Sequence, residues 1–122
     1  MVENNVLSDK ALAFGIRIVN GYKYLVDTHK EFVMSKQILR CGTSIGANSF
    51  EAIYTQSKAD FISKLGISLK EASETSYWLT LLHKTSYIDD SMYTSMKKDL
   101  DEIIRIIVKT IKTTRQNEQQ KD

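Results

Sequence analysis

The segment SKQILRCGTSIGANSFEA, residues 35–52, constrains the fold more than any other part of the chain. Its apolar residues have helical spacing, yet many of its residues are small. An interior Gly lowers helix stability by about 1 kcal/mol relative to Ala, so such a helix is favoured where other backbones approach it closely. The segment therefore predicts a helix that packs between neighbours on more than one side, inside a helical bundle and at a contact between subunits.

The rest of the chain predicts helices as well. The sequence has 122 residues and no proline, which favours one domain of long helices with short connections. Apolar spacing predicts helices at about 8–29, 34–56, 58–85 and 90–115, with Ser57 as a cap of the third. Residues 1–7 are expected to be a flexible tail and residues 116–122 a polar tail. We therefore expect an all-α, antiparallel up-down-up-down four-helix bundle over residues 8–115.

The cysteine content and the hydropathy of the chain favour a cytoplasmic location. The single cysteine, Cys41, has no partner for an internal disulfide, which favours a reducing environment. The chain has no run of about 18 apolar residues, and its first residues do not resemble a signal peptide. We expect a cytoplasmic protein without a membrane partner.

The helix expected at 34–56 carries two rows of small and apolar residues. One row contains Ile38, Cys41, Ile45, Asn48 and Ala52, and the other follows it one position later along the chain. If one row faces its own bundle, the other would form an exposed apolar patch in a monomer, which monomers usually avoid. The chain is therefore expected to form a homo-oligomer. The expected contact residues are Leu39, Gly42, Gly46, Ser49, Phe50 and Ile53.

Basic residues gather in the last quarter of the chain. Residues 1–90 contain 10 basic and 10 acidic residues, whereas residues 91–122 contain 7 basic and 5 acidic residues. Spacings of 7, 4 and 3 place the first four members of a basic stripe on one helix face, and the fifth flanks it. The stripe predicts contacts with the phosphates of RNA or DNA, or alternatively a solvated face with cations near a helix C-terminus. Its members are Lys98, Arg105, Lys109, Lys112 and Arg115.

Charged residues at matching heights predict ion pairs between helices. Hairpin register places Arg40 level with Glu74 and Glu71 level with Arg105, with Arg17 at nearly the same height. We interpret Arg40, Glu74, Arg17 and Glu71 as structural pairs that fix helix register, with ligand binding as the alternative.

Catalytic and metal-binding patterns are weak. Neither His29 nor His83 follows a Glu by three residues, as di-iron bundles require. A zinc site of these histidines and Cys41 is an alternative to two exposed histidines and a buried thiol. The GTSIG run lacks the lysine of a phosphate-binding loop. We predict a non-enzymatic protein with no cofactor and no metal.

Three segments carry a family resemblance: FGIRIVNGYKYL, SKQILRCGTSIGAN followed by Glu51 and Ala52, and DFISKLGISLKEASETSYWL. Over residues 10–112 the chain resembles the 23S rRNA intervening-sequence proteins, which are similar to the accessory variability determinant of diversity-generating retroelements. The resemblance implies a homopentameric ring of four-helix bundles and a link to nucleic acid. We expect an accessory protein that associates with RNA or DNA through its fourth helix. The alternative is a protein–protein adapter, for example for a reverse transcriptase, without direct nucleic-acid contact.

Overall fold

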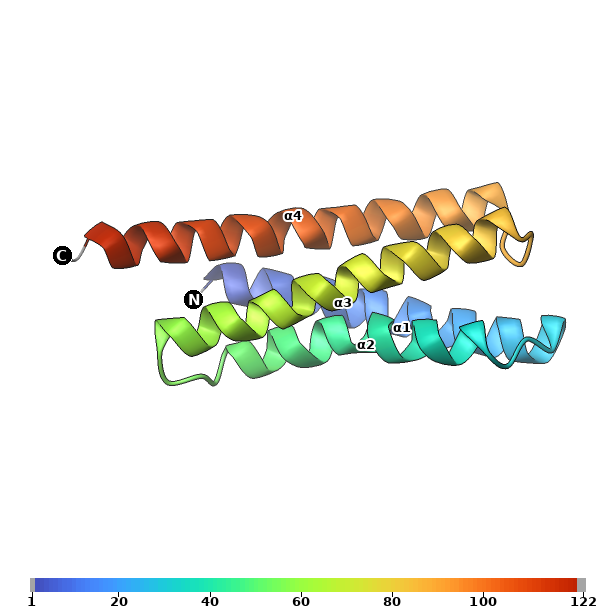
Figure 1. Ribbon diagram of the computed structural model, residues 1–122, viewed down its shortest axis with the longest axis horizontal. Helices are drawn as coiled ribbons and strands as arrows, with labels where there is room; N and C mark the ends of the chain where they lie inside the picture. The colour runs from blue at the N-terminus through green and yellow to red at the C-terminus, as the bar shows by residue number, and fades with distance from the viewer. Residues whose placement is uncertain (1, 121–122) are drawn as a thin grey trace.

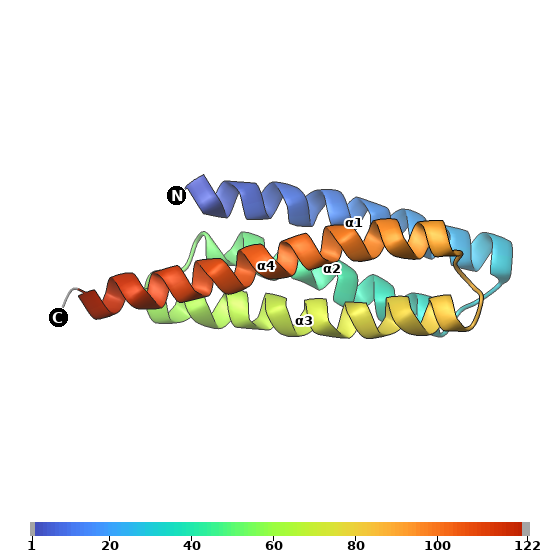
Figure 2. The ribbon, with the colours of Figure 1, turned by 90° about the horizontal axis from the view of Figure 1, so that it is seen from above.

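The computed structural model describes residues 2–120, which form four helices and no strand. These are α1 (Val2–His29), α2 (Met34–Ala52), α3 (Lys58–Lys84) and α4 (Asp90–Gln120). Figure 1 shows the helices lying lengthwise and alternating in direction, and Figure 2 shows the same arrangement from above. The predicted all-α four-helix fold is confirmed.

The ends of three helices differ from the expected boundaries. α1 begins at Val2 rather than near residue 8, and Leu7 lies in the core with 1% of its surface exposed. α4 continues to Gln120, because Gln and Glu are good helix formers and no Gly or Pro interrupts this segment. α2 ends at Ala52, four residues early, and residue Ser57 is extended so that its hydroxyl can cap α3. The expected tails are therefore helical within residues 2–120.

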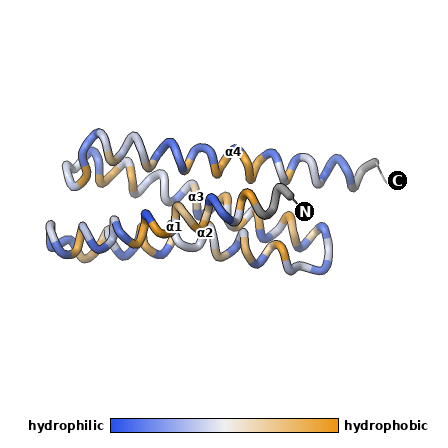
Figure 3. The backbone as a smooth tube through the Cα atoms, turned by 180° about the vertical axis from the view of Figure 1, so that it is seen from behind, coloured by the Kyte–Doolittle hydropathy of each residue, from blue (hydrophilic) through white to orange (hydrophobic). Residues whose placement is uncertain are grey.

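The core lies along the bundle axis and contains one apolar stripe from each helix. On α4 the apolar stripe is buried at Met96, Leu100, Ile103, Ile107 and Ile111, with Met92 partly buried against it. Figure 3 shows that hydrophilic and hydrophobic residues alternate along α4, as expected for a helix with one buried side.

Small residues of α2 allow close approach of both sequence neighbours. A Cβ atom added at Gly42 would lie 2.8 Å from Ile18 of α1, and one at Gly46 would lie 3.4 Å from the carbonyl oxygen of Ala11. On the opposite side, the Ser49 and Ser68 hydroxyl oxygens are 3.0 Å apart. α2 is therefore crowded by α1 and α3 of its own chain.

Polar side chains fix the starts of three helices. The Glu31 carboxylate accepts hydrogen bonds from the backbone N–H groups of Val33, Met34 and Ser35 at 3.1, 3.2 and 2.7 Å. The predicted cap Ser57 accepts from the Asp60 N–H at 3.1 Å, and Asp89 accepts from the Met92 N–H at 2.8 Å. These bonds satisfy N–H groups that have no partner within their own helix.

Candidate functional site

The structure buries two of the six residues predicted for the oligomer contact on α2. Gly42 and Ser49 are buried against α1 and α3 and form no outer surface. Leu39, Gly46 and Ile53 are half-buried, and of the six expected residues Phe50 alone is exposed. Sequence spacing distinguishes faces of a helix, but it does not show which face meets the rest of the same chain. Both predicted rows are used within the bundle.

An apolar surface that includes Gly46 and Phe50 of the predicted contact lies in a groove between α1 and α2. Leu12 and Ile16 of α1 are 65% and 55% exposed, and Phe50 of α2 is 56% exposed. Val19, Thr43, Gly46 and Ala47 also line this groove. Monomers seldom expose contiguous apolar patches of this kind unless they bind something.

The amino-acid sequence of α1 indicates this groove through a second line of apolar residues. α1 has a second apolar line at Leu12, Ile16 and Val19, spaced by four and three residues beside the buried stripe. With two apolar lines, the apolar face of α1 is wider than packing inside the bundle requires, so part of it remains exposed.

The basic stripe lies on the exposed side of α4. All five of its side chains are exposed, and none forms an ion pair with another side chain among residues 6–117. Helical geometry places Lys98 about 26 Å from Arg115 along the axis. Hereafter the basic stripe means Lys98, Arg105, Lys109, Lys112 and Arg115.

The carboxylates between these cations are paired elsewhere. Asp99 pairs with Arg17 of α1 at 2.6 Å, and Glu102 pairs with Lys10 of α1 at 2.7 Å. Asp101 pairs with Lys97 of α4 itself at 2.6 Å. The acidic residues that would otherwise weaken the positive field are therefore compensated by cations outside the stripe. Sequence reasoning missed this because two of the three partners lie on the first helix.

The end of α4 projects from the bundle. Figures 1 and 2 both show its C-terminal part continuing past the start of α1 and the start of α3. The last members of the basic stripe, Lys112 and Arg115, lie toward this end. A long partner can therefore approach this part of α4 with little obstruction from the other helices.

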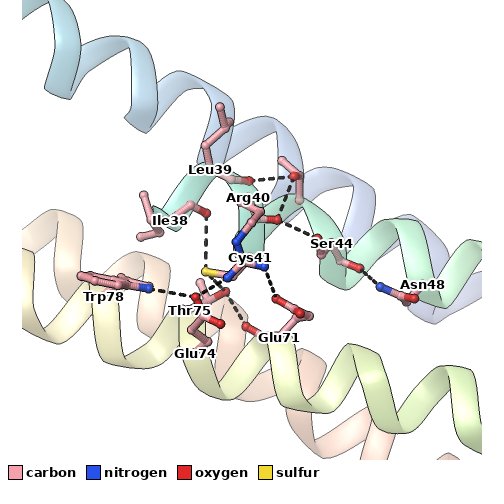
Figure 4. Close-up of polar contacts among 11 residues, drawn as sticks. Ile38, Leu39, Arg40, Cys41, Ser44, Asn48, Glu71, Glu74, Thr75 and Trp78 are labelled. Carbon is pink, nitrogen blue, oxygen red and sulfur yellow. Dashed lines mark hydrogen bonds and ion pairs between the residues drawn. The ribbon is translucent and has the colours of Figure 1, made fainter. Parts of the chain in front are cut away.

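A second charged cluster joins α2 to α3 (Figure 4). Arg40 forms the predicted ion pair with Glu74 and also pairs with Glu71 at 3.2 Å. The Arg40 hydrogen bond, assisted by the Trp78 indole N–H at 3.1 Å, lowers the pKa of Glu74. The Arg40 side chain is 51% exposed, so the cluster is a surface network rather than a buried one.

All four residues expected in structural pairs form ion pairs, but the expected match of Glu71 with Arg105 is wrong. Arg17 lies outside the Arg40 cluster because it reaches α4, where it donates to Asp99 and to Ser95. Arg105 is exposed on the outer side of α4 and does not meet Glu71, which Arg40 occupies. Equal height along the bundle axis therefore predicted the ion pair between α2 and α3. It did not predict the partners of Arg17 and Arg105, because these depend on the direction in which each side chain points.

The three residues of the alternative zinc site lie in separate environments. Cys41 is fully buried, which raises the pKa of its thiol, and the Thr75 hydroxyl donates to its sulfur at 3.2 Å. His29 contacts Tyr24 and Tyr87, whereas His83 pairs with Asp90. Among the described residues no three His, Cys, Asp or Glu side chains gather as a metal site would need.

Within residues 2–120 no helix has both the length and the apolar character of a membrane span.

Comparison with known proteins adds a family and a related structure. The family model described as 23S rRNA-intervening sequence protein matches residues 3–109. The structure is similar to the crystal structure of a protein with unknown function from the S23 ribosomal protein family of Bacteroides thetaiotaomicron VPI-5482. The sequences are 58% identical, the match covers 90% of this chain and 98% of that chain, and the TM-score is 0.89. No curated protein matches the chain.

Proposed function

The chain belongs to the family of 23S rRNA-intervening sequence proteins, and we propose that it is a non-enzymatic accessory protein that associates with RNA or DNA. Its contact surface is the basic stripe of α4. One observation carries the proposal: the stripe's cations are exposed and form no ion pair among residues 6–117, while the acidic residues between them are paired with other cations. Cations that replace the counterions of phosphates gain affinity from the release of those counterions.

Self-association through the groove between α1 and α2 is the second part of the proposal. The exposed side chains of Leu12, Ile16 and Phe50 would be covered by a second copy of the chain. A homo-oligomer, for which the resemblance implies a pentameric ring, would carry several basic stripes. Several weak contacts on one assembly raise the overall affinity without any new contact.

The alternative function is a protein–protein adapter. The groove supports it, because an exposed apolar groove also suits a helix of another protein, such as a reverse transcriptase. The adapter needs no contact between the basic stripe and nucleic acid, so the two functions differ in what α4 does.

Charge reversal tests the proposed function. Lys98→Glu, Lys109→Glu and Lys112→Glu together should abolish binding of fluorescein-labelled RNA and DNA, measured by fluorescence anisotropy at low salt. The matched control reverses Lys23, Lys36 and Lys70, which are exposed on α1, α2 and α3 and change the net charge equally. Binding should persist in the control. Equal loss in both variants would contradict a role for the stripe, and no binding by the unaltered protein would leave the adapter as the better account.

A further inference from the structure

Resting on the proposed association with nucleic acid, we infer that the ligand of the basic stripe is a duplex, bound through its phosphates and without reading of its bases. The inference follows from the shape of the stripe and from the side chains that accompany it on α4.

The stripe is long, and its first four cations share one face of α4, with Arg115 beside that face. Its five cations lie on one continuous helix and extend over about 26 Å. A duplex carries one negative charge per about 1.7 Å of axis and stays straight over about 150 base pairs. A row of cations along one helix can therefore meet phosphates of a duplex without bending it. A flexible single strand would have to be ordered along the same row, at a cost in conformational entropy.

α4 offers no platform for bases. Proteins that bind single strands stack the bases on aromatic side chains, each worth about 1–3 kcal/mol. The one aromatic residue of α4 (Asp90–Gln120) is Tyr93, whose ring is stacked on His83 with centroids 4.3 Å apart. The exposed rings lie on the other helices and their connections rather than on α4; they are Tyr24, Phe32, Phe50, Tyr54 and Tyr77. The surface of α4 therefore offers cations to the phosphates of a single strand but no exposed aromatic ring on which its bases could stack.

The setting of α4 also disfavours reading of base edges. A recognition helix inserts its side chains into a groove, and the major groove of an RNA duplex is too narrow for this. The middle of α4 lies beside α1, where the Arg17–Asp99 and Lys10–Glu102 pairs join the two helices. This bulk beside the stripe keeps the middle of α4 at the outside of a duplex, where the phosphates are. We therefore expect affinity that depends little on sequence.

Anisotropy titrations of the full chain test the inference with four probes of equal length, each of about 20 base pairs or nucleotides, which is longer than the stripe. The probes are an RNA duplex, a DNA duplex, an unstructured RNA strand and an unstructured DNA strand. At least one duplex should bind about tenfold more tightly than both single strands, and a duplex of scrambled sequence should bind equally well. The DNA and RNA arms show which duplex is preferred.

The outcomes separate the inference from the proposal on which it rests. If single strands bind as tightly as duplexes, or if scrambling the duplex abolishes binding, the inference is wrong while nucleic-acid association stands. If none of the probes binds at about 50 mM salt, the association itself fails, and the inference falls with it. The Lys98, Lys109 and Lys112 reversal should remove duplex binding, and the Lys23, Lys36 and Lys70 reversal should keep it.

Discussion

Arg17 of α1 donates a hydrogen bond to Asp99 of α4 across 2.6 Å, although the two residues are 82 positions apart in the chain. The pair joins the first and last helices, which the sequence does not connect directly. It also compensates an acidic charge that lies next to Lys98 in the basic stripe. One ion pair therefore contributes to the fold and to the positive surface.

Breaking this pair should weaken nucleic-acid binding even though Arg17 is outside the stripe. In Arg17→Gln, Asp99 keeps its charge without a partner and repels phosphates, so we expect affinity for a labelled duplex to fall a few-fold. Adding Asp99→Asn should restore it. Because both side chains are partly exposed, a double-mutant cycle on stability should give a coupling of only about 0.2–1 kcal/mol. Unchanged affinity in Arg17→Gln would contradict the compensating role.

A charge placed in the α1–α2 groove should prevent self-association. A side chain at Gly15 would meet no atom within 4 Å of its Cβ, so the protomer can accept Gly15→Glu without a clash. We expect this variant to sediment at 14.0 kDa while the unaltered protein sediments as an oligomer. Gly15→Ala keeps the groove apolar and should leave the oligomer intact. A monomeric unaltered protein would refute the role of the groove.

Gly42→Ala should destabilise the protomer, because its Cβ would lie 2.8 Å from the packed side chain of Ile18. Overpacking costs about 1–3 kcal/mol, and the gain in helix propensity offsets about 1 kcal/mol of it, so we expect a net loss of about 1 kcal/mol. Urea unfolding measures the change. Gly66→Ala, where the Cβ has open space, should instead stabilise the protein by a similar amount. Equal shifts in the two variants would show that α1 does not approach α2 as closely as described.

Glu31→Gln should lower stability at neutral pH and have less effect in acid. Partial burial is the largest single influence and raises the pKa of Glu31, but the N–H donors of Ser35, Val33 and Met34 together lower it below 4.5. Because the pKa of Glu31 is lower in the folded protein than in the unfolded chain, its ionised carboxylate stabilises the fold at pH values above the unfolded-state pKa. This stabilisation is lost as the pH falls through the folded-state pKa. We expect a loss of about 1 kcal/mol at pH 7 that shrinks toward pH 3.

The same unfolding series needs a control carboxylate. Asp27 is exposed and has no hydrogen bond or ion pair among the described residues, so Asp27→Asn should change stability little at either pH. A Glu31→Gln effect that stays constant between pH 7 and pH 3 would argue against capping by an ionised carboxylate.

Local features of the fold could be predicted from the sequence. The Ser57 cap and the buried line from Met96 to Ile111 depend on residues within a few positions of each other, so spacing was sufficient. The Arg40–Glu74 pair was also predictable, because α2 and α3 form a hairpin whose register follows from its turn. The start of α1 and the end of α4 were predicted too far inside the chain. These segments are polar and were expected to be tails, but they contain no Gly or Pro that would end a helix.

Relations between helices that are distant in the chain could not be predicted in the same way. Gly42 and Ser49 were assigned to an oligomer contact because spacing shows that a helix has two faces and not which neighbours meet them. Leu12 and Ile16 form the exposed groove with Gly46 and Phe50, since the buried stripe of α1 faces the core. The compensation of Asp99 by Arg17 likewise depends on how the bundle closes.

The salt dependence of duplex binding tests the central claim most directly. If the five cations of one stripe each neutralise a phosphate, the logarithm of the binding constant should fall linearly with the logarithm of salt concentration, with a slope of about −4.5 per protomer engaged. The unaltered protein titrated between about 50 and 200 mM salt supplies the slope. A steep negative slope supports phosphate binding by the stripe. A slope near zero, or no binding at the lowest salt, would contradict it.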